Sequence, residues 1–297
     1  MALKSTGLLI CILILTNCKG QEDQFSMRKE LPADLKEISG IAKDGNFLWA
    51  ITDNKKRTIY KLDLTGNIIQ QIEVTNASFD DVEAVTADKD YLYVGDVGDN
   101  NGTRKNRSIM RILKSSIGKN SQTSVTGQLI SFNFPDEGET KKKKSNNYDC
   151  EAMISYKDSL FVFTKRRGDM KTELYALPKS PGNYIARSVS EFKSKGMITD
   201  ASINKAGNEI ALLGYDEGHT KPFIWVLSNF KGNNFFSGNH ERFDLTNEKH
   251  LDWQVEGISY GDNNQFFFSC EKTKDMHNSV YLIDKAKLHL SKKGNED

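Results

Sequence analysis

The segment CEAMISYKDSLFVFTKRRGDMKTELYAL, residues 150–177, contains three short apolar or aromatic runs separated by polar turns. The runs are CEAMI, LFVF and ELYAL, and each is four or five residues long. Short runs bounded by turn residues are typical of β-strands, whereas a helix needs an apolar period of about 3.6 residues over a longer stretch. The segment therefore predicts three consecutive strands.

The same unit occurs five times along the chain. Its first run carries a polar or acidic residue followed by a small one, in ISGIA (38–42), VEAVT (82–86), CEAMI (150–154), TDASI (199–203) and VEGIS (255–259). Its second run is apolar and aromatic, in FLWAI (47–51), YLYV (91–94), LFVF (160–163), EIALL (209–213) and QFFF (265–268). Repeats with a small-residue first strand are typical of a β-propeller, because the innermost strands crowd around the axis.

We therefore expect an all-β protein, a β-propeller of five blades with four antiparallel strands each. The last blade has only 41 residues after Glu256. Its fourth strand is predicted to come from the N-terminal segment around residues 25–29, so that no sheet edge is left open. A sixth blade within residues 113–148 is the alternative, although LISFNF (129–134) is explained as the fourth strand of the second blade.

The N-terminal segment predicts export from the cytoplasm. Residues 7–15 form an apolar run that is too short to span a bilayer and suits the core of a signal peptide. The sequence LTNC that ends at Cys18 resembles the signal of bacterial lipoproteins, with Cys18 as the lipidated residue. An ordinary cleaved signal peptide or an uncleaved anchor is the alternative. The expected organisation is a signal peptide at 1–17, a tether and ring-closing strand at 18–30, and one propeller domain at 31–297.

These features predict a lipoprotein of a bacterial cell envelope, in the outer membrane or the periplasm. The polar residues after Cys18 resemble the surface-export signals of some lipoproteins, which would expose the protein on the cell. We expect membrane contact through the lipid alone, and a monomer. The chain has 41 basic and 40 acidic side chains, so no excess positive charge favours nucleic acid as a partner. Cys150 and Cys270 are expected to be two buried thiols.

The polar residues that open the five first runs are expected to converge on the propeller axis; they are Ser39, Glu83, Glu151, Asp200 and Glu256. Four carboxyl groups in a narrow channel mouth repel one another when ionised, so their ionised forms are disfavoured unless a cation neutralises them. Oxygen ligands favour calcium, and the five histidines are not spaced as a metal pair. The sequence therefore predicts a central calcium ion. The alternative is that the acids cap turns or pair with backbone amides.

A second set of polar residues follows the second strands on the same face; it comprises Asp53, Asp96, Asp99, Asn100, Lys165, Arg166, Arg167, Glu271 and Lys272. The basic run at 165–167 suits an anionic small molecule such as a phosphoester, with Asp99, Asn100 and Lys272 as further ligand-binding residues. Asp53, Asp96 and Glu271 are the candidates for a catalytic base. The alternative is a rim of salt bridges between neighbouring loops.

The ordered set of Ser39, two glutamates, an acid and Glu256 resembles the calcium-activated nucleotidase (apyrase) propellers. The segments LWAITD (48–53), LYVG (92–95) and FVFTKRR (161–167) are similar to that family's second strands and the loops after them. The resemblance implies a central calcium ion held by the five axial residues, and nucleotide hydrolysis. Two departures are Asp200, where the family tends to have serine, and the acidic GDVGDN (95–100). The chain also looks like phytase-like and esterase-like propellers and propeller lipoproteins of Bacteroidetes type.

Two functions are therefore expected. The first is a calcium-dependent hydrolase of phosphate esters or anhydrides such as nucleotides. The second is a non-catalytic ligand-binding or scaffold lipoprotein in which calcium only ties the blades together.

Overall fold

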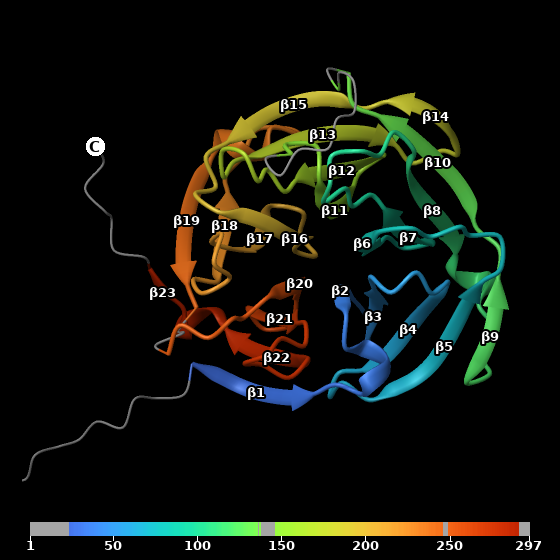
Figure 1. Ribbon diagram of the computed structural model, residues 1–297, viewed down its shortest axis with the longest axis horizontal. Helices are drawn as coiled ribbons and strands as arrows, with labels where there is room; N and C mark the ends of the chain where they lie inside the picture. Colours follow the sequence, from blue (N-terminus) through green and yellow to red (C-terminus); the bar gives the residue numbers. More distant parts are fainter. Residues whose placement is uncertain (1–23, 136, 138–145, 246–248, 291–297) are drawn as a thin grey trace, which may run out of the picture.

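The computed structural model describes residues 24–135, 137, 146–245 and 249–290, which form a ring of five β-sheets (Figure 1). The five-bladed, all-β propeller is thereby confirmed. The predicted signal peptide, Cys18 and the start of the tether lie outside the described residues. In the part of the chain that the structure describes, no helix has the length and apolar character needed to cross a membrane. Its helical elements are short 3-10 turns: η1 (Ala33–Leu35), η2 (Lys114–Ser116), η3 (Phe235–Ser237) and η4 (Lys285–Lys287).

The blades follow one another along the chain, and the first strand of each lines the axis. Blade 1 contains β2 (Ile38–Asp44), β3 (Phe47–Thr52), β4 (Thr58–Asp63), β5 (Ile68–Val74) and β9 (Gln122–Val125). Blade 2 contains β6 (Val82–Ala87), β7 (Tyr91–Asp96), β8 (Arg107–Leu113), β10 (Gln128–Asn133) and β14 (Gly182–Ile185). Blade 3 contains β11 (Cys150–Tyr156), β12 (Ser159–Thr164), β13 (Thr172–Pro178) and β15 (Arg187–Phe192). Blade 4 contains β16 (Met197–Ile203), β17 (Glu209–Tyr215), β18 (Phe223–Ser228), β19 (Asn239–Asp244) and β23 (His289–Leu290), and blade 5 contains β20 (Val255–Tyr260), β21 (Gln265–Cys270), β22 (Ser279–Asp284) and β1 (Phe25–Glu30).

Three blades have a fifth strand that the sequence did not predict. In the sequence, strand β9 lies between β8 and β10 of blade 2. In the fold it pairs in parallel with β5 of blade 1. Strand β14 lies between β13 and β15 of blade 3 in the sequence, and it pairs in parallel with β10 of blade 2. Strand β23 follows blade 5 in the sequence and pairs antiparallel with β19 of blade 4. These strands are only two to four residues long. Each is held by main-chain pairing with the edge of the sheet that it joins, and it thereby links one blade to its neighbour.

The N-terminal strand closes the ring. Strand β1 pairs antiparallel with β22, with Phe25 opposite Ile283 and Glu30 opposite Ser279. The ring of Phe25 lies 5.2 Å from that of Tyr281 and 5.7 Å from that of Phe268. The first and last parts of the propeller are therefore joined by main-chain pairing and by aromatic contacts.

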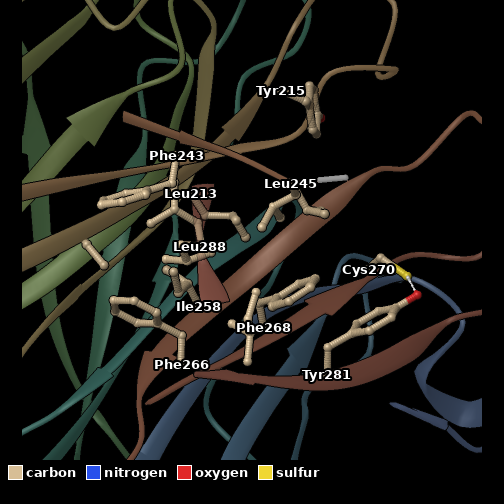
Figure 2. Packing of buried hydrophobic residues seen from close by; sticks show 14 of the residues in the cluster. Leu213, Tyr215, Phe243, Leu245, Ile258, Phe266, Phe268, Cys270, Tyr281 and Leu288 are labelled. Carbon is tan, nitrogen blue, oxygen red and sulfur yellow. Dashed lines mark hydrogen bonds between the residues drawn. The ribbon is translucent and has the colours of Figure 1, made fainter. Parts of the chain in front are cut away.

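Apolar layers between adjacent blades form the core. Figure 2 shows the layer between blades 4 and 5, where Leu213 and Phe243 meet Ile258 and Phe268. The rings of Phe268 and Tyr281 are stacked, with centroids 4.6 Å apart and an interplanar angle of 4°. Cys150 and Cys270 are buried free thiols, as expected. This packing fixes the inner strands and thus the side chains that they present at the axis.

Candidate functional site

One end of the ring collects the start of every first strand and the end of every second strand; we call it the axial mouth. Each first strand has a β-bulge close to its start, where one residue has no partner in the neighbouring strand. A bulge re-aims a side chain away from the regular alternation of the strand. The bulged residues are Ser39, Glu83, Glu151, Thr199 and Glu256.

In blade 4 the structure brings Thr199, and not Asp200, to the bulged position. Thr199 Oγ1 donates a hydrogen bond of 2.7 Å to the carbonyl oxygen of Val255. In blade 1, Ser39 Oγ donates at 2.6 Å to the carbonyl oxygen of Val82. Val255 directly precedes the bulged Glu256, and Val82 directly precedes the bulged Glu83. The hydroxyls of Thr199 and Ser39 therefore make equivalent hydrogen bonds to a neighbouring blade.

Asp200 lies deeper and is fully buried. Its Oδ1 accepts a hydrogen bond from the N–H of Ala201, and its Oδ2 accepts one from the N–H of Ile258, both at 2.7 Å. Burial raises the pKa of Asp200 well above its usual range. The side chain thus ties two inner strands together and does not join the other acids.

Three acids come together where blades 1 and 2 meet. Asp53 follows β3, Asp81 precedes β6, and Glu83 is the bulged residue of β6; one carboxylate oxygen from each lies within 4.8 Å of the others. Burial, then the charge of Asp81, raises the pKa of Asp53 to about 7. Burial, then the charge of Asp149, raises that of Asp81 to about 6. We call these three residues the acid triad.

Glu83 is the most buried member of the triad. Burial, then the charge of Glu151, raises its pKa well above the usual range. In the described part of the chain, no lysine or arginine forms an ion pair with any triad member. Sequence reasoning found Asp53 and Glu83 and missed Asp81. The available signal was the pair Asp80-Asp81, which stands directly before the VEAVT run.

The other two axial glutamates, Glu151 and Glu256, have side-chain partners within the protein. Lys165 Nζ lies 2.5 Å from Glu151 Oε2 and donates a 2.7 Å hydrogen bond to the hydroxyl of Tyr215. That hydroxyl donates in turn to Glu256 Oε1 at 2.9 Å. The four side chains are buried and form one network. Lys165 therefore brings a buried positive charge to this side of the mouth.

The basic run at 165–167 is divided between two faces. Arg167 lies 3.1 Å from Asp149 Oδ2 and 3.7 Å from Glu151 Oε1, so it joins Lys165 at the mouth. Arg166 instead pairs with Asp169 and, at 2.8 Å, with Glu191. The three cations do not form one cluster.

The acidic loop after β7 is held by its own carboxylates. Asp96 Oδ1 accepts the N–H of Asp81 at 2.8 Å and pairs with Arg104 at 2.9 Å. Asp99 Oδ2 pairs at 2.7 Å with Arg107, whose side chain is completely buried. Both aspartates thus have structural partners, and Asp96 positions the backbone of a triad member.

Three further predicted residues lie at the rim. Asn100 is exposed and accepts a hydrogen bond from Arg167. Burial, then the charge of Glu256, raises the pKa of Glu271 to about 8. Lys272 is exposed, and its backbone N–H donates to the carbonyl of Lys36 at 2.9 Å.

A pocket of about 320 Å³ opens beside the acid triad. Asp53 and Asp81 line it, together with the polar side chains of Lys55, Asn100 and Arg104. The pocket therefore combines carboxylate oxygens with two cationic groups, of which Lys55 pairs with Asp80 at 3.1 Å and Arg104 pairs with Asp96 at 2.9 Å.

Comparison with known proteins gives a partial family match and distant structural likenesses. The model of the SdiA-regulated family matches residues 18–101, a segment that contains the acid triad. No curated protein matches the sequence. Among solved structures, the chain is similar to hydrazine synthase of Kuenenia stuttgartiensis, with 12% identity, a TM-score of 0.44, and 91% of this chain and 69% of that one covered.

Two further likenesses are also distant. The PQQ-bound aldose sugar dehydrogenase of Streptomyces coelicolor has 11% identity and a TM-score of 0.47, with 86% of this chain and 98% of that chain covered. A Bacteroides uniformis protein described as a 6-phosphogluconolactonase has 13% identity and a TM-score of 0.41, with coverages of 86% and 70%.

Proposed function

We propose that the protein is a lipid-anchored propeller of the bacterial cell envelope that binds calcium at its axial mouth and there hydrolyses phosphate esters or anhydrides such as nucleotides. The observation that carries the proposal is the acid triad: three carboxyl groups converge beside an open pocket, and no lysine or arginine among the described residues forms an ion pair with them. Cys18, in its lipoprotein-like sequence context, supports the anchor.

The donor set of the triad fits calcium. Calcium prefers carboxylate and carbonyl oxygens at about 2.3–2.6 Å, so two ligands on opposite sides of one ion are at most about 5 Å apart. The oxygen atoms of Asp53, Asp81 and Glu83 meet this limit. Glu151 and Glu256 are less suited, because Lys165 and Tyr215 already bind them. We therefore restrict the proposed ligand set to the triad and leave Asp200 out of it.

The pocket beside the triad supports an anionic ligand. Lys55 and Arg104 present cationic groups there, and Asn100 adds an amide. A bound calcium ion would supply polarisation of a phosphoryl oxygen. Lys55 and Arg104 would orient the remaining oxygens by charge-assisted hydrogen bonds. Asp96 is a weak candidate for the base, because it holds the backbone of Asp81.

The position of β1 bears on orientation in the envelope. Glu30, the last residue of β1, lies at the mouth end of blade 5, whereas Phe25, the first, lies at the opposite end. A lipid on Cys18 would therefore be tethered to the face away from the mouth. This arrangement supports a site that opens away from the membrane.

Calcium titration of the chelator-stripped full chain tests the proposal. We expect calcium to bind, to raise the melting temperature, and to support phosphate release from ATP, UDP or p-nitrophenyl phosphate. Asp81→Asn should weaken calcium binding at least tenfold. Asp262→Asn is the matched control, because Asp262 is exposed in the loop at the other end of blade 5. Absence of calcium binding by the unaltered protein would refute the proposal.

A non-catalytic role is the second candidate, and the pairing of the basic run favours it. Lys165, Arg166 and Arg167 are all engaged by carboxylates of the chain. A stabilising effect of calcium without phosphate release from any of the three probes would select this candidate.

A further inference from the structure

A second pocket lies outside the axial mouth, on blade 2, and we call it the blade 2 pocket. Its volume is about 460 Å³, within the range of about 300–1,000 Å³ that small-molecule sites have. It is lined by side chains of β8, β10 and β14, the three outer strands of that blade (Figure 1), and by Phe79 from the segment between β5 and β6. The blade 2 pocket shares no lining residue with the pocket beside the acid triad.

The strand register places a row of polar side chains across the blade 2 pocket. Ser108 of β8 is opposite Ser131 of β10, and Ser131 is opposite Asn183 of β14. All three residues line the pocket. Residues opposite one another in neighbouring strands point to the same face of the sheet, and neighbouring strands are about 4.7–4.9 Å apart. The row therefore presents two hydroxyls and an amide side by side to one small ligand.

The polar groups of the strands are not used by the fold. In the described part of the chain, no hydrogen bond is made by the side chains of Ser108, Ser131, Asn133 or Asn183, which all line the pocket. The amide of Asn76, also in the lining, is by contrast bonded through both its oxygen and its nitrogen to the main chain. Asparagine is disfavoured in β-strands, yet Asn133 and Asn183 stand in β10 and β14. Strand pairing holds both backbones, so their free amides need little reorganisation to meet a ligand.

Apolar side chains flank the polar row. Met110 and Leu129 are opposite each other in β8 and β10, on the same face as the row, and both line the pocket. Leu129 is 50% exposed, although it stands in the middle of a paired strand. Phe79 is half-buried and packs against the apolar cluster that contains Met110. The pocket thus combines a hydrogen-bonding row with an aromatic ring and two aliphatic chains.

The charged side chains of the lining are mostly paired. Asp96 pairs with Arg104 at 2.9 Å, and Arg107 pairs with Asp99 at 2.7 Å. Lys105 is exposed and forms no ion pair with the described residues. The pocket therefore has one free cationic group, which does not make the cluster of cations that is typical of a phosphate site.

We propose that the blade 2 pocket binds a short saccharide, a function separate from calcium binding and hydrolysis at the mouth. The hydroxyls of a sugar ring both donate and accept hydrogen bonds, as do the side chains of Ser and Asn. Ser108, Ser131 and Asn183 bind the hydroxyls at the edge of the ring. The apolar C–H face of the ring packs on Phe79 and Leu129, in the way that apolar lining and a few placed polar groups together hold small ligands.

The test begins with the unaltered full chain and four probes: maltotriose, cellotriose, triacetylchitotriose and digalacturonate. Titration calorimetry is carried out in the presence of calcium and in chelator, and amide chemical shifts are recorded by NMR. We expect at least one probe to bind with a Kd of about 10 mM or lower, equally well in both conditions. The largest shift changes are expected in β10 and β14.

Three variants locate the bound sugar. Asn183→Ala removes an exposed amide of the row, and Phe79→Leu removes the aromatic ring but keeps an apolar side chain. Each should weaken binding by about three- to tenfold. Asn239→Ala is the matched control, because Asn239 is an exposed asparagine on the outer strand β19 of blade 4 and does not line the pocket. The control should keep the full affinity, and melting temperatures check that all three variants fold.

Lys105→Met distinguishes a neutral from an acidic sugar. The free ammonium of Lys105 favours the carboxylates of digalacturonate, so the variant should weaken binding of that probe and leave the three neutral probes unaffected.

The outcomes separate this inference from the proposed function. Absence of binding of all four probes would overturn the inference, and so would unchanged affinity in both Asn183→Ala and Phe79→Leu. Saccharide binding that requires calcium would assign the sugar to the acid triad and also overturn it. Saccharide binding in chelator, lost in the two variants, would support it even if the protein failed to bind calcium or to release phosphate.

Discussion

Lys165 Nζ lies 2.5 Å from Glu151 Oε2 inside the propeller, where both side chains are buried. An internal ammonium group thus stands at the axis, next to a glutamate that the sequence assigned to calcium. Burial of a carboxylate without a partner is costly, and this pairing explains how the axis tolerates Glu151.

Replacement of Lys165 by Met should therefore destabilise the fold. The variant leaves Glu151 buried without its main partner, and we expect the free energy of unfolding to fall by about 3–5 kcal/mol. Urea denaturation measures the loss. The double variant Lys165→Met with Glu151→Gln should recover part of it, because the orphaned charge is removed. Equal stability of the single and double variants would contradict this account.

The raised pKa values predict an unusual pH dependence for the metal-free protein. Asp53, Asp81 and Glu271 titrate at about 7, 6 and 8 in the folded protein, against ordinary values of 3.8, 3.8 and 4.5. The folded state thus binds more protons than the unfolded state between about pH 4 and 8, so its stability falls as pH rises through this window. Melting temperatures in chelator should be higher at pH 5.5 than at pH 8.

Calcium should reverse that trend, because it replaces protons on the triad. The rise in melting temperature on addition of calcium is expected to be larger at pH 8 than at pH 5.5. The same rise at both pH values would indicate binding at groups other than the triad.

Much of the fold was predictable, because each blade repeats the same local pattern of short apolar runs and turns. The fifth strands were not, since QTSV in β9 and GNYI in β14 have too little apolar alternation to be read as strands. Their pairing is tertiary: each segment completes hydrogen bonds at the edge of a neighbouring blade. Local sequence carries no signal for such a partner.

The site was predicted in part. Glu83 and Asp53 were identified by their place in the repeat, but the choice between Thr199 and Asp200 depended on which residue is bulged, and both are polar. The separation of Arg166 from Lys165 and Arg167 could have been predicted from the sequence. Side chains alternate along an extended chain, so Arg166 points away from its two neighbours.

Asp200 provides a direct test of the bulge assignment. Its carboxylate accepts backbone N–H groups on both oxygens, and Asp200→Asn would place an amide NH₂ against one of them. We expect a loss of about 1–3 kcal/mol in unfolding free energy and unchanged calcium affinity. Calorimetry and urea denaturation on the same samples separate the two effects. A large loss of calcium affinity with normal stability would instead identify Asp200 as a ligand.

Ring closure by β1 leads to the last prediction. The half-buried ring of Phe25 packs against Trp253, Phe268 and Tyr281, so Phe25→Ala should cost about 2 kcal/mol, less than a fully buried aromatic residue would. The loss should be local at first, because the freed edge of β22 becomes open to solvent. Amide hydrogen exchange should therefore accelerate in β22 before it does in β13 of blade 3. Ser26→Ala is the control: its exposed hydroxyl donates one hydrogen bond, to the carbonyl of Leu282, among the described residues, so exchange in β22 should change little. Uniform acceleration in all blades of Phe25→Ala would mean that the ring opens as one cooperative unit and that β1 is not a separate closure.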